Sequence, residues 1–233
     1  MQAIFLEDED RVNAFINSVS KPRLSKYLQE SGGKNALALQ LYHWNAKLSQ
    51  SLYLPLQSWE IVLRNRMNEF FIYKYNDKWP TNAQANRNFA GNDRNRLSET
   101  INRLTRAAGT QPTTDQIVAD LSAGFWVSQF GRNYEAQYGW RNNLKYRIFV
   151  NDHSIDRQTA DEICNDLLDL RNRVAHHEPI FHLPLDNWRS DLDFILRAMC
   201  PSTADYMASA CSFKDVWNEK PGIQILLGEV PAE

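Results

Sequence analysis

The chain of 233 residues lacks the features that mark several protein classes. Its three cysteines, Cys164, Cys200 and Cys211, are few, odd in number and without C-x-x-C spacing, which argues against a disulfide scaffold and a thiolate zinc site. The apolar runs, such as Ile225-Leu226-Leu227, are far shorter than the ~20 residues of a membrane helix. The acidic start, MQAIFLEDEDR, is unlike a signal peptide. We therefore expect a protein of a reducing cytoplasm without a membrane partner.

An excess of positive charge is also missing, because the net charge is −2. The charges are nevertheless segregated: residues 86–106 and residues 132–147 each carry a local +3, and residues 152–169 carry −5. Such runs are commonly solvated helix faces. The alternative is a basic track that guides a phosphate backbone beside an acidic helix. The candidate RNA-binding residues of that track are Arg94, Arg96, Arg103, Arg141, Lys145 and Arg147.

Apolar residues recur with helical spacing, and no segment alternates for long with the two-residue period of a strand. The expected helices cover residues 8–19, 22–31, 35 to about 75, 97–108, a short stretch after the Thr113 capping box, about 156–176, and 184–200. Pro55 is expected to kink or divide the longest of them, and polar residues 76–92 to form a loop. Short helices joined by turns are expected between Gly124 and Phe149. With neither repeats nor a linker, we predict one all-α domain over residues 1–233, ending in a tail from about 221.

The stretch most informative about chemistry is LRNRVAHHEPI, residues 170–180, in which four residues separate Arg171 from His176. An arginine can bind two phosphate oxygens at once, and a histidine can exchange a proton at cellular pH. In an ideal helix the two side chains would lie about 140° apart. Either the helix unwinds before Pro179 or a second chain completes the site. The simpler alternative is structural: Arg171 complements the helix dipole, and the histidines cap the helix end.

The spacing of Arg171 and His176 resembles the R-x(4–6)-H motif of HEPN ribonucleases. The longer string RNRVAHHEPIF is similar to the signature of Abi-like (abortive infection) proteins, a bacterial branch of the HEPN folds. Further blocks resemble that family in order, over about residues 20–220. They are KPRLSKY (21–27), LYHWN (41–45), WEIVLRN (59–65) and GFWV (124–127), followed by Phe130, Tyr134-Glu135 and Trp140.

The resemblance implies an HEPN-like helical bundle with flanking helices. It also implies a metal-independent endoribonuclease, acting as a toxin or antiphage effector in the bacterial cytoplasm. A ribose 2′-hydroxyl would attack the adjacent phosphate, which leaves a 2′,3′-cyclic phosphate. His176 would transfer the proton, Arg171 would bind the phosphate and Asn172 would orient the site. The supporting candidates are His177, Glu60 and Arg64.

We expect no cofactor. The expected partners are an RNA substrate, or a structured non-coding RNA, and a second copy of the chain. A homodimer would supply two R-x4-H motifs, with the motif helix, about 156–177, at its interface. The resemblance also allows an antitoxin. The alternatives are a non-catalytic RNA-binding or regulatory protein and an interaction scaffold without an RNA role.

Overall fold

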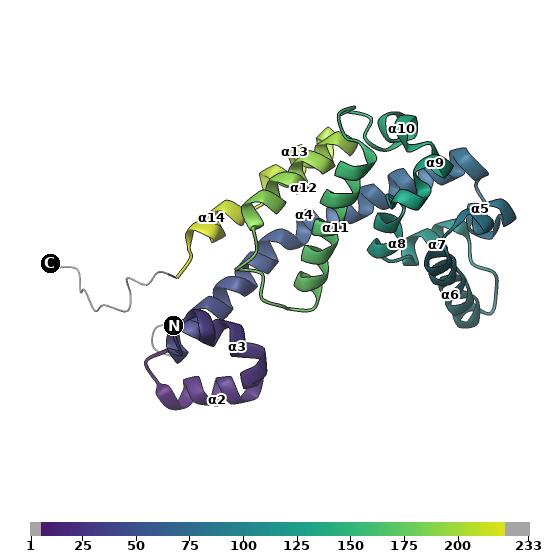
Figure 1. The fold of residues 1–233 in the computed structure, drawn as a ribbon. Helices are drawn as coiled ribbons and strands as arrows, with labels where there is room; N and C mark the ends of the chain where they lie inside the picture. The colour runs from purple at the N-terminus through teal and green to yellow at the C-terminus, as the bar shows by residue number, and fades with distance from the viewer. Residues whose placement is uncertain (1–5, 222–233) are drawn as a thin grey trace. The chain divides into compact units, whose positions relative to one another are not determined.

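The computed structural model describes residues 6–221, and within this range every regular element is a helix (Figure 1). The predicted all-α class is therefore confirmed. No helix in these residues is both long and apolar enough to cross a membrane. The run Ile225–Leu227 and all but the first residue of the predicted tail, about 221–233, lie outside the described part of the chain.

The described residues divide into two compact units. The first contains the chain up to Tyr53, Arg173–Leu185 and the residues from Cys211 on. The second contains Leu54–Asn172 and Asp186–Ala210. The single domain expected over residues 1–233 stays a prediction.

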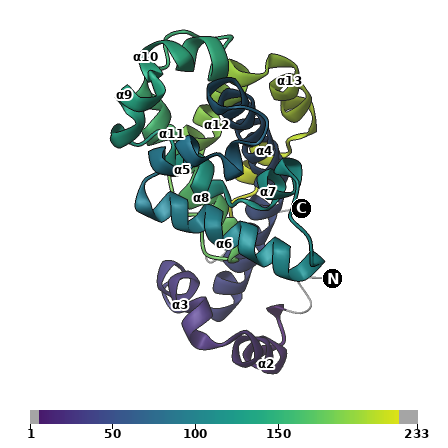
Figure 2. The same cartoon turned by 90° about the vertical axis from the view of Figure 1, so that its right-hand side faces the viewer.

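The first unit begins with two short helices, α2 (Glu9–Val19) and α3 (Lys21–Glu30), which lie side by side (Figure 2). Asp8 caps α2 by accepting a hydrogen bond from the Arg11 amide. After α3 the chain turns through Gly32 and Gly33, both at positive φ, where glycine carries no Cβ penalty. The core of this unit is aromatic. The Tyr27 and Phe181 rings are 5.2 Å apart, and Trp44 contacts Trp217 of α14 (Phe213–Asn218).

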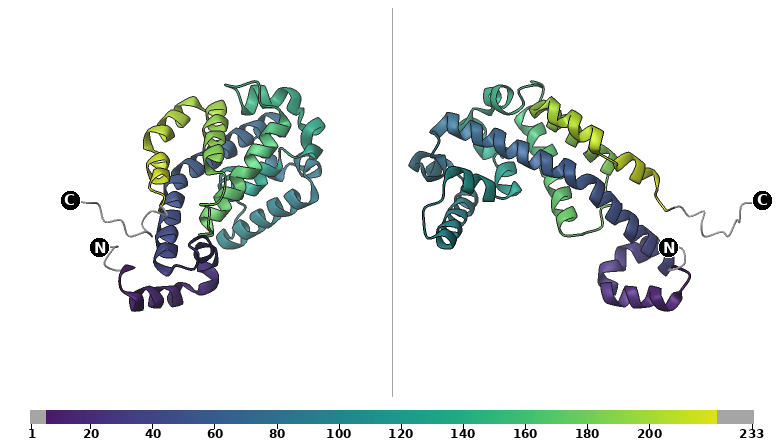
Figure 3. Two further views of the ribbon diagram at one scale, coloured as in Figure 1. Left: turned by 60° about the vertical axis from the view of Figure 1, so that its left-hand side comes forward. Right: turned by 180° about the vertical axis from the view of Figure 1, so that it is seen from behind.

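Helix α4 (Asn35–Tyr75) is 41 residues long and contains Pro55 in its interior. Figure 3 draws it as one long unbroken helix. The predicted division at Pro55 is therefore wrong. A proline has no N–H to donate to the carbonyl four residues earlier, which here belongs to Ser51. The Cys211 thiol lies 3.7 Å from that oxygen and donates to it instead. A side chain from the other end of the sequence thus replaces the missing backbone donor.

The predicted loop at residues 76–92 is also wrong, because the segment forms η1 (Trp79–Thr81) and α5 (Ala83–Asn88) and starts α6 (Gly91–Ala108). Asn82 caps α5 by accepting hydrogen bonds from the amides of residues 84 and 85. Trp79 is buried and donates to Asn68 Oδ1 at 2.8 Å. Two buried aromatic residues, Trp79 and Phe89, therefore order a segment whose composition is mostly polar.

An aromatic core holds the second unit together. In α4, the Phe70 ring centroid lies 4.7 Å from that of Trp140, and the Phe71 ring centroid lies 4.8 Å from that of Trp79. The Tyr134 ring stacks on the Tyr138 ring. The predicted capping box at Thr113 and the short helices between residues 124 and 149 are confirmed. The remaining elements are α7 (Thr114–Asp120), α8 (Ala123–Ser128), η2 (Arg132–Tyr134), α9 (Glu135–Tyr138), α10 (Trp140–Asn143), η3 (Leu144–Ile148), α11 (Arg157–Ala175), α12 (Leu185–Met199) and α13 (Pro201–Ala210).

Candidate functional site

Arg171 lies in the last turns of α11, and its side chain is fixed by a carboxylate from α4. Its Nε donates to Glu60 Oε2 at 3.0 Å, and its Nη1 donates to Asn172 Oδ1 at 3.3 Å. The Arg171 side chain is 38% exposed, whereas that of Glu60 is 24% exposed. Three of the residues singled out from the sequence thus meet in the second unit. The arrangement orients the guanidinium while part of the Arg171 side chain stays exposed.

Arg64 lies one helical turn after Glu60 on α4, so their side chains share one side of the helix. The Arg64 side chain is partly buried, and its Nε has no hydrogen-bond partner among the described residues. A buried guanidinium nitrogen without a partner is costly. Arg64 also places a positive charge one helical turn from Glu60, the residue that pairs with Arg171.

The two histidines follow the end of α11, where the chain closes the helix with a Schellman turn. The Glu178 amide donates to the Arg173 carbonyl at 2.8 Å, and the His177 amide donates to the Val174 carbonyl at 3.1 Å. His177 occupies the left-handed position, with φ 58°, that usually holds glycine. His176 and His177 are both exposed. The helix thus ends at Ala175, so the ideal-helix angle does not apply to His176.

Three side chains that the sequence did not single out as site residues hold this turn within the first unit. Arg23 Nη2 donates to the His176 carbonyl at 3.0 Å. Asn45, which is 4% exposed, accepts from the Ile180 amide at 2.7 Å and the Phe181 amide at 3.2 Å, and donates to the Glu178 carbonyl at 3.3 Å. Arg173 pairs with the Glu178 carboxylate at 3.3 Å. The only signal for Asn45 and Arg23 was their place in the blocks LYHWN and KPRLSKY.

Arg171 belongs to the second unit and His176 to the first. The structure brings Glu60 and Asn172 to Arg171. It places His177 next to His176, in the turn that ends the helix. The catalytic roles expected for these residues stay predictions.

The predicted RNA-binding arginines of α6 make hydrogen bonds within the second unit. Arg94 donates to the carbonyls of residues 86, 87 and 89, and so ties α5 to the start of α6. Arg96 pairs with Asp93 at 3.2 Å, and Arg103 pairs with Asp120. Each of these side chains therefore has a structural role, and a role in RNA binding stays a prediction.

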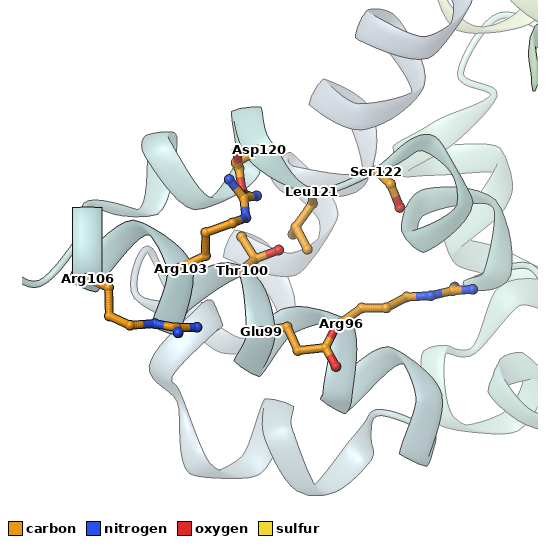
Figure 4. A pocket seen from close by; sticks show the side chains of 8 residues that line it. All are labelled: Arg96, Glu99, Thr100, Arg103, Arg106, Asp120, Leu121 and Ser122. Carbon is orange, nitrogen blue, oxygen red and sulfur yellow. Dashed lines mark hydrogen bonds and ion pairs between the residues drawn. The ribbon is translucent and has the colours of Figure 1, made fainter. Parts of the chain in front are cut away.

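Arg96 and Arg103 also line an open hollow of about 390 Å³, together with Arg106, Glu99 and Asp120. Figure 4 shows Arg103 pointing toward Asp120, whereas Arg96 extends away from that pair. The guanidinium groups do not converge on one point, and two carboxylates lie among them. The hollow therefore lacks the focused positive charge of a phosphate site.

The other predicted RNA-binding residues lie in and just before η3. Arg141 and Arg147 are exposed, and Lys145 is partly exposed. The guanidinium carbon of Arg147 lies 3.8 Å from the centroid of the Tyr73 ring, which is a close cation–π contact. The arginines of α6 are exposed as well, so the two groups differ in the hydrogen bonds of Arg94, Arg96 and Arg103 and not in exposure.

No cluster of three or more His, Cys, Asp or Glu side chains within residues 6–221 is arranged to hold a metal ion. Comparison with protein-family models, with curated proteins and with solved structures finds no match to this chain. The family resemblance therefore rests on the motifs of the sequence alone.

Proposed function

We propose that the chain is a metal-independent endoribonuclease of the HEPN type, acting in bacteria as a toxin or antiphage effector. The observation that carries the proposal is Arg171, which Glu60 orients at 3.0 Å while 38% of its side chain remains exposed. The exposed His176 follows in the R-x4-H spacing. The resemblance of RNRVAHHEPIF to the Abi-like signature supports an HEPN-like fold and supplies the reaction class.

The chemistry assigned to these residues is phosphoryl transfer within RNA. The hydrogen bonds of Arg171 to described residues use Nε and Nη1, so the N–H groups of Nη2 are the donors assigned to a phosphate oxygen. His176 takes the proton of the 2′-hydroxyl as its oxygen bonds to phosphorus. The bond from phosphorus to the 5′-oxygen then breaks, and this oxygen takes up a proton. The products are a 2′,3′-cyclic phosphate and a 5′-hydroxyl.

We predict that the active form is a homodimer. One chain has a single R-x4-H motif, and the reaction needs both a proton acceptor and a proton donor. Two copies related by a two-fold axis, with α11 at the interface, would supply both. Sedimentation should show a dimer, and mixing Arg171→Ala chains with His176→Ala chains should restore part of the cleavage that each variant lacks. A monomer that cuts RNA at micromolar concentration, in a His176-dependent way, would contradict the prediction.

A non-catalytic RNA-binding or regulatory protein, associated with a structured non-coding RNA, is the second candidate. The Glu60–Arg171 ion pair favours it, because the carboxylate neutralises the guanidinium that would stabilise negative charge in the transition state. In that case wild-type protein should bind RNA and leave it uncut.

The deciding experiment induces wild-type, His176→Ala and His43→Ala chains in bacteria and compares growth and the ends of cellular RNA. His43 is an exposed histidine of α4 and serves as the matched control. The nuclease proposal expects growth arrest and cyclic phosphate ends with the wild type and His43→Ala, and neither with His176→Ala. Cleavage by purified protein should survive EDTA, since the site is built from Arg and His. Activity that is lost in EDTA and restored by a divalent ion would overturn the metal-free mechanism.

A further inference from the structure

Three tyrosines of the second unit are exposed, although most of its aromatic side chains are buried, and two of the three have Lys or Arg beside them in the sequence. Tyr73, near the end of α4, is 59% exposed, and Tyr146, in η3, is 66% exposed. The Arg147 guanidinium lies over the Tyr73 ring at 3.8 Å, and the His153 ring lies 5.7 Å from that of Tyr146. We call Tyr73, Tyr146, Arg147 and His153 the tyrosine patch. A planar cation and three rings are thus presented by α4, η3 and the segment after it.

The chain around the tyrosine patch is rich in positive charge. Lys145 and Arg147 flank Tyr146 directly, and Lys74 follows Tyr73. The one acid within residues 132–147 is Glu135, whose carboxylate pairs with Arg157 at 3.4 Å.

A second carboxylate near the patch, Asp152 beside His153, accepts hydrogen bonds from both the amide and the hydroxyl of Ser154. These hydrogen bonds favour the charged form of the Asp152 carboxylate, but Lys74, Lys145 and Arg147 outnumber it beside the two tyrosines, which suits a polyanion.

We propose that the tyrosine patch binds unpaired bases of single-stranded RNA, an inference that rests on the proposed function and names the form of RNA recognised. An exposed aromatic ring stacks on any base, because every base has a π-face. Arg147 over Tyr73 extends that flat surface with a cation, and Arg141 and Lys145 attract the phosphates. A duplex keeps its bases paired and stacked, and so offers the rings nothing to stack on.

The test measures binding in His176→Ala protein, so that RNA stays intact. The probes are a labelled oligouridine and a duplex of the same length, followed by fluorescence anisotropy. Adding Tyr73→Ala and Tyr146→Ala should weaken binding of the single strand about fivefold or more, and leave duplex binding unchanged. The matched control is Tyr206→Ala in α13, because Tyr206 is 65% exposed and its helix carries no Lys or Arg.

The outcomes separate this inference from the nuclease proposal. Suppose that wild-type protein cuts RNA and the tyrosine variant binds oligouridine as tightly as the Tyr206→Ala control. The proposed RNA binding by the tyrosine patch is then overturned, and the nuclease proposal is retained. If wild-type protein cuts no RNA but single-strand binding depends on the tyrosines, the nuclease fails and the patch stands. Absence of RNA binding overturns both, and the patch would then fit a protein partner.

Discussion

At the scale of single residues, Asn45 has the most consequential contacts near the candidate site. Its buried amide satisfies three backbone groups of the segment after the histidines. We predict that Asn45→Ala lowers the free energy of unfolding by about 2–4 kcal/mol, because buried amides lose their acceptor. Chemical denaturation measures this loss. Asn165→Ala, at an exposed position of α11, is the control and should change it by less than about 1 kcal/mol. Equal effects of the two substitutions would contradict the role of Asn45.

Arg171 allows a test of geometry against charge. Arg171→Lys should reduce RNA cleavage nearly as much as Arg171→Ala, because an ammonium cannot bind Glu60 and a phosphate through one planar group. Initial rates on a short RNA measure the effect. The same exchange at Arg197, which pairs with Asp193 and Asp205 on the surface, should leave the rate unchanged. Near-normal cleavage by Arg171→Lys would show that charge alone is needed.

Asn45 and Arg171 also show how much of the candidate site could be predicted from the sequence. The spacing of Arg171 and His176 was visible directly, and Glu60 was named through the family resemblance. Asn45 could not be identified as a site residue, because its partners are backbone groups 133 to 136 positions away. Periodicity predicts which face of a helix is buried, but not which distant backbone a buried amide will meet.

At the scale of helices, the end of α11 is closed by a residue that is unfavourable there. His177 has φ 58°, where a side chain with a Cβ costs about 1–2 kcal/mol. We predict that His177→Gly raises the free energy of unfolding by about 0.5–1 kcal/mol, after the greater flexibility of unfolded glycine is subtracted. Thermal and urea unfolding measure the gain.

Cleavage assays of His177→Gly then distinguish the two roles of His177. Undiminished cleavage by a stabilised variant would make His177 a turn residue. A loss of cleavage together with a gain in stability would indicate that strain is kept for function. No change in stability would contradict the account of the turn.

The helices also show where prediction from local pattern fails. Gly109 ends α6, and the Thr113 capping box starts α7. Both act through contacts within four residues, so the local sequence is enough to predict them. The prediction of a loop at residues 76–92 is wrong, because the order of this segment comes from the burial of Trp79 and Phe89 in the aromatic core. Tertiary packing overrides a polar composition there.

At the scale of the whole molecule, the buried tyrosines predict sensitivity to alkali. Burial is the largest cause that raises the pKa of Tyr27, Tyr134 and Tyr138 above its ordinary value of 10.0. In the unfolded chain these phenols ionise near pH 10. Their contribution to stability is thus fully present below pH 10 and is lost as the pH rises above it.

A titration can check this prediction. Tyrosinate absorbance and helical circular dichroism should change together above pH 10 for the buried residues Tyr27, Tyr134 and Tyr138. Tyr138→Phe should make the alkaline loss of stability less steep, and Tyr206→Phe should not. Complete ionisation near pH 10 with the helix content unchanged would contradict the prediction.

The hydrogen bond from the Cys211 thiol to the Ser51 carbonyl has a consequence for folding during translation. Cys211 lies 160 positions after Ser51. The Trp44 indole donates to the Val216 carbonyl, and Val216 lies 172 positions after Trp44. A ribosome therefore releases the first helices long before their hydrogen-bond partners exist. The whole of the second unit is synthesised in between. The residues translated first should thus be among the last to reach their final contacts, and until then their apolar surface is free to associate with other chains.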